Sequence, residues 1–382
     1  LKIVAGGLTA MARARQILLD HPAVDVVVRG EGEVPLAALV ERDFAALDEI
    51  PGLTYRQGGL IVENGGPFFF DDLGRVPSPL TAGTVSLAEI PPEIGAPIEI
   101  GRGCPNTCAY CSYRDRPGYR LFPLQRIRAD LAWAKAHGIS TISLLSAAVD
   151  PSAPSFRRLV DEIRAIYGDE EFRLVVSIER DCQRPEVFEQ VRDLPFFRFM
   201  FGLQTTNPQS LKRIGRPRPD LARFGAALQV ASQIAQTQVD VMYGLPGDSF
   251  AGLQETMGWL YGLNRETPEA VGMILACWTV AAPGTPLGDR PESFGIRRLA
   301  TPGIPYVLET DTYSFDDLIR SIDYLYAERE HAPIMMFDGD VPRHLPPTRD
   351  RVAPPRATGG RGGPPVPQHC LEPGTDAGRR RA

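Results

Sequence analysis

The sequence predicts an α/β fold in which a partial barrel of six strand–helix units, a partial (β/α)6 barrel, follows a smaller parallel sheet. From residue 97 onward, short runs of β-branched and aromatic residues alternate with segments whose apolar residues recur every three or four positions. Near the start of the chain, two apolar runs flank one helical segment. Strands that alternate with helices in this way are typical of parallel sheets with buried faces.

The first unit is predicted to hold two parallel strands. A strand at Ile3–Ala5 ends in Gly6-Gly7, a helix follows at Thr9–Asp20, and a second strand at Val24–Val28 precedes Arg-Gly-Glu-Gly-Glu. Two parallel strands cannot bury both faces. We therefore expect earlier strands upstream of this sequence, whose first residue is leucine within the alternating pattern.

A hairpin follows the first unit. Gly52–Arg56 and Leu60–Asn64 are separated by Gln-Gly-Gly, which favours a tight turn. A stretch rich in glycine and proline then indicates a crossing between domains. The predicted divisions are residues 1–78 for the first domain, 79–96 for a linker, 97–290 for the barrel, 291–345 for a C-terminal segment and 346–382 for a disordered tail.

The barrel is predicted from six strands and five intervening helices. The strands are expected at Pro97–Ile100, Ser140–Leu145, Arg173–Ser177, Phe197–Leu203, Val239–Tyr243 and Val271–Cys277. The helices are expected at Leu124–His137, Ser155–Tyr167, Pro185–Arg192, Asp220–Gln236 and Phe250–Asn264. A last helix is expected at Phe315–Glu328, where Ser314 and Asp317 have the spacing of a capping box.

Composition excludes several classes of protein. The formal net charge is −6, so no global positive field attracts nucleic acid or anionic lipid. No apolar run is long enough to span a membrane, and the start lacks the order of a signal peptide. We therefore expect a cytoplasmic enzyme with no nucleic-acid or membrane partner.

Three cysteines lie on one segment directly after the first barrel strand. Cys104, Cys108 and Cys111 occur in Gly-Cys-Pro-Asn-Thr-Cys-Ala-Tyr-Cys. Thiolates with this spacing can converge on an iron–sulfur cube and leave one iron open for a chelating cosubstrate. The sequence therefore predicts a 4Fe-4S site on this loop.

Two other roles for these cysteines are weaker. Structural zinc needs a fourth ligand, yet His137 lies far along a predicted helix, and Cys182 and Cys277 belong to other elements. Six cysteines in 382 residues are also too few for a disulfide framework. For Cys182 and Cys277 we favour the role of buried free cysteines.

The spacing of the three cysteines, with Tyr110 before the third, resembles the defining loop of the radical S-adenosylmethionine (SAM) superfamily. The resemblance implies a 4Fe-4S cluster that reductively cleaves SAM and produces a 5′-deoxyadenosyl radical. It also implies an external electron donor such as flavodoxin or ferredoxin, and a small-molecule or natural-product substrate.

The same resemblance implies a set of SAM contacts. The segment from Phe201 to Arg216 is similar to one that binds SAM in this superfamily, so Glu179 and Gln204 would contact the ribose or methionine part and Arg216 the carboxylate. A solvated basic patch is the alternative for Arg216. Gly244 and Gly247 resemble the turn that passes close to adenine, and Tyr110 of the cluster loop is also expected to contact SAM. The run Leu144–Asp150 lacks the glycines that many members carry there.

The first unit resembles the C-terminal part of a Rossmann-like cobalamin-binding domain. The resemblance rests on glycines and acidic residues that follow the two predicted strands, namely Gly6, Gly7, Gly30, Glu31, Gly32 and Glu33. Glycine lets backbone approach a bulky ligand at strand ends. The alternative is two ordinary strand-to-helix turns.

Together these features resemble cobalamin-dependent radical SAM methyltransferases, which implies C-methylation of an unreactive carbon. Radical rearrangement, cyclisation or oxidation without methyl transfer remains open. A catalytically inactive cluster-binding protein or gene fragment also remains open.

Overall fold

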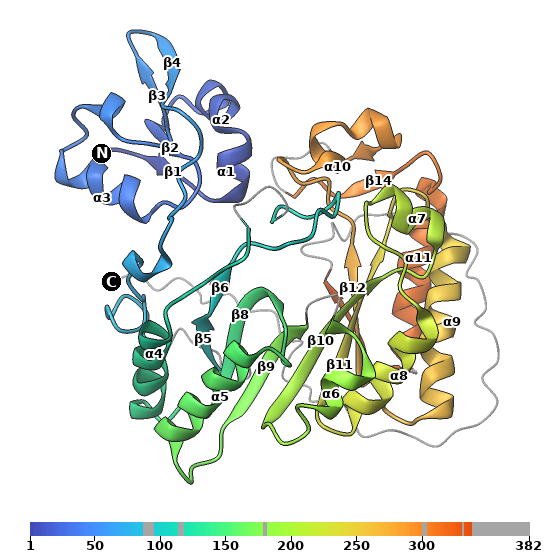
Figure 1. The fold of residues 1–382 in the computed structure, drawn as a ribbon. Helices are drawn as coiled ribbons and strands as arrows, with labels where there is room; N and C mark the ends of the chain where they lie inside the picture. Colours follow the sequence, from blue (N-terminus) through green and yellow to red (C-terminus); the bar gives the residue numbers. More distant parts are fainter. Residues whose placement is uncertain (87–94, 114–117, 179–181, 300–303, 331, 338–382) are drawn as a thin grey trace, which may run out of the picture.

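The computed structural model describes residues 1–86, 95–113, 118–178, 182–299, 304–330 and 332–337 (Figure 1). The predicted disordered tail and Cys370 lie outside these residues. None of the described helices is long and apolar enough to cross a membrane.

A seven-stranded sheet forms the barrel, in the order β15-β12-β11-β10-β9-β8-β5, and every neighbouring pair is parallel. Its strands are β5 Ala96–Glu99, β8 Thr141–Val149, β9 Arg173–Ile178, β10 Phe196–Gln204, β11 Gln236–Tyr243, β12 Met273–Trp278 and β15 Ile334–Phe337. The α/β class and all six predicted strands are confirmed. The seventh strand, β15, was not predicted and extends the sheet beyond β12.

Helices alternate with the strands in sequence. Most of them lie along one face of the sheet, and two short ones lie at one end of the strands (Figure 1). The helices are α4 Leu124–Ala136, α5 Pro154–Tyr167, α6 Pro185–Glu189, α7 Pro208–Arg213, α8 Leu221–Ser232, α9 Phe250–Glu266, α10 Pro286–Asp289 and α11 Phe315–Glu328. Short 3-10 helices span Leu47–Glu49, Leu73–Arg75 and Pro291–Phe294, and β13 Arg297–Arg298 pairs with β14 Val307–Glu309.

Two predicted helix starts are confirmed by their caps. The Asp220 side chain accepts a hydrogen bond from the Arg223 backbone N–H, and Ser314 and Asp317 form a capping box at α11. The predicted end of the helix at Gln236 is wrong. Instead Gln236 begins β11 opposite Arg198, because pairing with β10 satisfies its backbone better than another helical turn.

Apolar side chains between the sheet and its helices make the core. Phe199 and Phe201 on β10 are fully buried and contact Phe188 of α6 ring to ring, while Phe201 also contacts Phe224 of α8. Side chains of the crossing segment join the same cluster, namely Phe70, Leu73, Val76 and Leu80. The barrel core therefore includes residues from both sides of the predicted domain boundary at 78.

The N-terminal unit is a four-stranded sheet in the order β1-β2-β3-β4. Its strands are β1 Val4–Ala5, β2 Val26–Val28, β3 Leu53–Gln57 and β4 Leu60–Glu63, and its helices are α1 Leu8–Ala12, α2 Ala14–Asp20 and α3 Glu33–Glu41. The parallel pair β1–β2 and the hairpin β3–β4 are confirmed, and the hairpin joins the sheet antiparallel to β2.

Two details of the N-terminal unit differ from prediction. The helix expected at Thr9–Asp20 is broken at Arg13, whose backbone (φ −122°, ψ 24°) is not helical, so it forms α1 and α2. The helix α3 was not predicted. A Cβ on Gly284 would lie 2.8 Å from the Ala12 Cβ, so α1 lies directly against the turn that follows β12 (Figure 1).

Candidate functional site

The cysteine loop, residues 103–119, is closed at its base by a two-stranded antiparallel ladder. β6 (Gly101–Arg102) precedes it and β7 (Arg120–Leu121) follows it. The Ala109 N–H donates to the Ile214 carbonyl at 2.7 Å, and the Leu287 N–H donates to the Ala109 carbonyl at 3.2 Å. The loop is thereby docked against the segment after α7 and the start of α10.

The three cysteines of this loop are free thiols. Cys108 is buried, and Cys104 and Cys111 are half-buried. Burial raises the pKa of the Cys111 thiol, and the nearby Cys108 and Cys104 raise it further. Burial also raises the pKa of Tyr110. Asn106 Nδ2 lies 3.6 Å from Cys104 Sγ and can donate to it.

In the described parts of the chain, no three cysteine, histidine or carboxylate side chains converge closely enough to hold a single metal ion. A four-iron cube makes a different demand, because each thiolate binds a separate iron. Three thiols on one docked loop with hydrogen-bond donors near the sulfurs fit such a cube better than they fit zinc.

Arg216 lies beside the cysteine loop. Its Nη1 lies 3.8 Å from Cys108 Sγ, and its Nη2 donates to the Gly202 carbonyl of β10. A guanidinium at this distance stabilises a thiolate and leaves other N–H groups for an anionic ligand. Arg216 is half-buried and lies next to the cysteine loop, where it could contact an anionic ligand.

Gln204 ends β10 in a left-handed conformation with φ +67°. The register to β11 shifts between Gly202 and Gln204, so the strand bulges at this point. The side chain is 8% exposed, and its Oε1 has no hydrogen-bond partner among the described residues. A buried amide oxygen without a partner, on a residue with strained backbone, is characteristic of a ligand-contacting residue.

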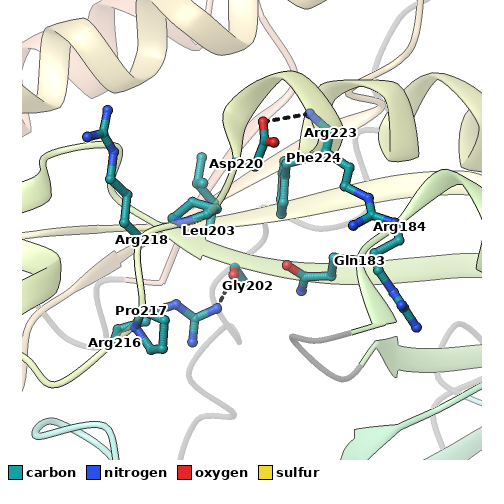
Figure 2. A pocket seen from close by; sticks show the side chains of 11 residues that line it. Gln183, Arg184, Gly202, Leu203, Arg216, Pro217, Arg218, Asp220, Arg223 and Phe224 are labelled. Carbon is teal, nitrogen blue, oxygen red and sulfur yellow. Dashed lines mark hydrogen bonds between the residues drawn. The ribbon is translucent and has the colours of Figure 1, made fainter.

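Gly202 lies next to the side chains of both Gln204 and Arg216. A Cβ at Gly202 would lie 2.9 Å from Gln204 Nε2 and 3.3 Å from Arg216 Nη2. Figure 2 shows the adjoining pocket, where the Arg216 guanidinium reaches toward Gly202 and the Gln183 amide lies across from it. The pocket has a volume of about 210 Å³ and is lined by Gln183, Arg184, Gly202, Leu203, Arg216, Pro217, Arg218, Pro219, Asp220, Arg223 and Phe224. Four arginines and one aspartate line the pocket, and Arg223 is paired with Glu186, so the net positive charge favours an anionic group.

The remaining predicted SAM residues have different surroundings. Gly244 has φ +78°, and a Cβ there would have no atom nearer than 3.8 Å. At Gly247 (φ +83°) a Cβ would lie 2.9 Å from Ser210 Cα, and its N–H donates to Thr312 Oγ1 at 2.7 Å. Contacts within the protein therefore explain Gly247. Glu179 lies outside the described residues.

The predicted cobalamin residues divide into two groups. Gly6 and Gly7 follow β1, and a Cβ on Gly7 (φ +90°) would meet nothing within 4 Å. Gly30 is enclosed, because a Cβ would lie 2.1 Å from the Phe68 carbonyl oxygen. Gly32 precedes α3, and Glu31 and Glu33 contact arginines. The open glycines after β1 thus offer space for a ligand, and Gly30 does not.

Asp240 was not among the predicted site residues. It lies on β11 beside Gly202, and burial raises its pKa to about 6, although Gln238 and Arg216 oppose this effect. Cys277 on β12 is nearby, and burial and then the charge of Asp240 raise its pKa to about 12. An aspartate between the buried Val239 and Val241 is the signal that could have identified it.

The chain is similar to known proteins across the residues of the barrel. The family model of the Radical SAM superfamily matches residues 98–260. The curated 2-(S-pantetheinyl)-carbapenam-3-carboxylate methyltransferase of Streptantibioticus cattleyicolor is 26% identical over 68% of this chain and 40% of its own length. The cobalamin-dependent radical SAM methyltransferase TokK of Streptomyces tokunonensis is 23% identical over 85% of this chain and 52% of its own length. The chain spans about half the length of these relatives.

A solved structure shares the fold. The radical S-adenosylmethionine methyltransferase TsrM from Kitasatospora setae, with cobalamin and a 4Fe-4S cluster bound, has a TM-score of 0.61 at 16% identity, covering 79% of this chain and 63% of that one. The matched residues include the cysteine loop, Gln204 and Arg216. Residues 98–260 of this chain are therefore a radical SAM domain.

Proposed function

We propose that this chain reductively cleaves SAM and carries out cobalamin-dependent C-methylation of a small molecule. The observation that carries the first step is the 3.8 Å distance between Arg216 Nη1 and Cys108 Sγ, close to the unpaired amide oxygen of Gln204. When bound, a reduced 4Fe-4S cluster supplies the electron that breaks the sulfonium bond and yields the 5′-deoxyadenosyl radical.

The residues of this chain supply binding and orientation. Arg216 is suited to the SAM carboxylate because a guanidinium forms charge-assisted, paired hydrogen bonds with carboxylates. Gln204 Oε1 is suited to a hydroxyl or ammonium donor, which would satisfy the unpaired buried oxygen. Gly244 leaves open space next to its backbone, which would accommodate a flat adenine.

The position of the N-terminal unit supports the methyl-transfer part of the proposal. The helix α1 packs against the turn after β12, and Gly6 and Gly7 lie just before that helix. Cobalamin bound at these glycines would thus lie near the carboxyl ends of the barrel strands, where substrates bind in α/β barrels. Both curated relatives are named as methyltransferases, and TokK as cobalamin-dependent.

Anaerobic reconstitution tests the cluster. We expect about four irons and four sulfides per chain. Cys104→Ala, Cys108→Ala and Cys111→Ala should each abolish the visible absorption of the cluster and most of its iron. Cys182→Ala and Cys277→Ala are the matched controls and should retain both. Iron retained in the triple variant would disprove the cluster assignment.

Product analysis tests the reaction. With a low-potential reductant such as flavodoxin, the protein should form 5′-deoxyadenosine from SAM. If methyl transfer is correct, S-adenosylhomocysteine should appear in a similar amount, and label from methyl-deuterated SAM should reach a substrate carbon. Product formed with deoxyadenosine but without S-adenosylhomocysteine would instead indicate rearrangement, cyclisation or oxidation. Failure of the fully reduced cluster to form deoxyadenosine would favour an inactive cluster-binding protein.

A further inference from the structure

Two arginines face each other at the base of the cysteine loop. Arg102 on β6 and Arg120 on β7 are directly opposite partners in the antiparallel ladder. Both side chains are largely buried, with 15% and 16% exposed. Like charges at opposed positions destabilise such a pair, and a two-stranded ladder is weak by itself. The ladder therefore needs an anion between the two guanidinium groups.

Glu31 of the N-terminal unit is that anion. Its Oε1 lies 2.8 Å from Arg120 Nη2 and 3.4 Å from Arg102 Nη1, and its side chain is 3% exposed. Its Oε2 accepts from the Phe70 N–H at 2.7 Å and lies 3.2 Å from Arg120 Nη1. Burial alone would raise the pKa of Glu31, but the hydrogen bonds from Arg120 and Phe70 outweigh burial and lower it.

The two arginines depend on Glu31 to different degrees. Arg102 also contacts Glu33 through Nη2 at 2.8 Å and Glu99 through Nε at 2.8 Å. For Arg120, Glu31 is the carboxylate partner found among the described residues. Loss of the charge on Glu31 would thus leave the β7 side of the ladder with a buried, uncompensated cation.

We propose that Glu31 is a positioning residue that fixes both ends of the cysteine loop by joining β6 to β7 and both strands to the N-terminal unit. This inference rests on the proposed function only in taking the loop to hold a cluster. The Arg-Gly-Glu-Gly-Glu segment, which the sequence suggests as a ligand contact, acts through its first glutamate as a brace for the loop. Gly30 is consistent with this role, because it lets the Phe68 backbone approach and places the Phe70 N–H against Glu31.

The test uses Glu31→Gln, which keeps the shape and removes the charge, and Glu31→Asp, which keeps the charge on a shorter side chain. Glu63→Gln is the matched control, because Glu63 lies in the same unit and forms a more exposed ion pair with Arg29. The apo protein is measured first, by hydrogen exchange of the peptides that carry β6 and β7 and by the rate of maleimide labelling of Cys104 and Cys111.

In Glu31→Gln we expect the rates of hydrogen exchange and of maleimide labelling to rise roughly tenfold. Local opening of the loop would then no longer have to break the charge-assisted contact between Glu31 and Arg120. Glu31→Asp should be intermediate, and Glu63→Gln should match the parent. In reconstituted protein, Glu31→Gln should also alter the electron paramagnetic resonance signal of the reduced cluster and its change on SAM addition. If Glu31→Gln does not fold, an unchanged Glu31→Asp refutes the proposal.

The two hypotheses fail in distinguishable ways. The positioning role would be overturned, and the proposed function left intact, if Glu31→Gln assembles a cluster and its hydrogen exchange, maleimide labelling and resonance signal are all unchanged. Faster exchange and labelling in a protein that never assembles a cluster would uphold the brace and overturn the proposed function.

Discussion

Asp240 should make the protein less stable as pH rises through the mildly acidic range. Its pKa is raised from 3.8 to about 6 because burial disfavours the carboxylate. A group with a raised acid pKa favours the folded state while it is protonated, so its contribution is complete below pH 4 and lost by about pH 6 to 7. This difference in pKa corresponds to about 3 kcal/mol, and partial exposure of the side chain lowers the expected value to about 1–3 kcal/mol.

The substitution Asp240→Asn tests this reasoning. The amide cannot ionise and retains an oxygen that can accept the hydrogen bond from Gln238 Nε2, which is 2.8 Å long in the parent. Urea unfolding of the apo protein should give equal stabilities for parent and variant near pH 4. At pH 7.5 the variant should be more stable by about 1–3 kcal/mol. Asp220→Asn is a suitable control, because it alters an exposed helix cap and asparagine caps equally well.

The decisive quantity is how the stability difference between parent and variant changes from pH 4 to pH 7.5, because other groups titrate alike in both proteins. A stability difference that is the same at pH 4 and pH 7.5 would refute the assignment of a raised pKa to Asp240. A variant that is less stable at pH 7.5 would show that the attraction of the carboxylate to Arg216 outweighs its burial.

Three further predictions concern other positions. Gly244→Ala should reduce the free energy of unfolding by about 1 kcal/mol because alanine disfavours the positive φ at this position. Gly247→Ala should reduce it by at least about 2 kcal/mol, because the new Cβ would also lie too close to Ser210, and equal reductions in urea unfolding would contradict this difference. Arg216→Gln should weaken SAM binding in equilibrium dialysis by about 2 kcal/mol, while Arg213→Gln, whose parent side chain is paired with Asp311, should leave affinity unchanged. Ser314→Ala should lower stability by about 1 kcal/mol in thermal unfolding and Ser314→Asp should restore it, unless the capping box at α11 is energetically silent.

The sequence predicted the elements whose signal is local. Strands of buried parallel sheets are rich in aromatic and β-branched residues, and β10 and the Val239–Tyr243 part of β11 were recognised for that reason. The strand β15 was missed because it is short and lies beyond a helix from its partner β12. The break at Arg13 was missed because no proline or glycine marks it.

Site residues were likewise predicted where the signal lies within one short segment of the sequence. The three cysteines lie within one short segment, so their spacing alone indicates the chemistry. The bridge from Glu31 to Arg120 joins residues 89 positions apart, and no periodicity in either segment indicates their contact. Arg216 was predicted from family resemblance, but its approach to Cys108 depends on how the loop docks.

The left-handed backbone at Gln204 has a consequence for attempts to engineer this protein. Glycine or asparagine adopts such a conformation at lower cost than glutamine, by about 1 kcal/mol. A library selected only for thermal resistance would therefore favour glycine or asparagine at this position and lose the glutamine side chain with its unpaired amide oxygen. Under the proposed role of Gln204 in SAM binding, selection for thermal stability and selection for activity would oppose each other at this residue.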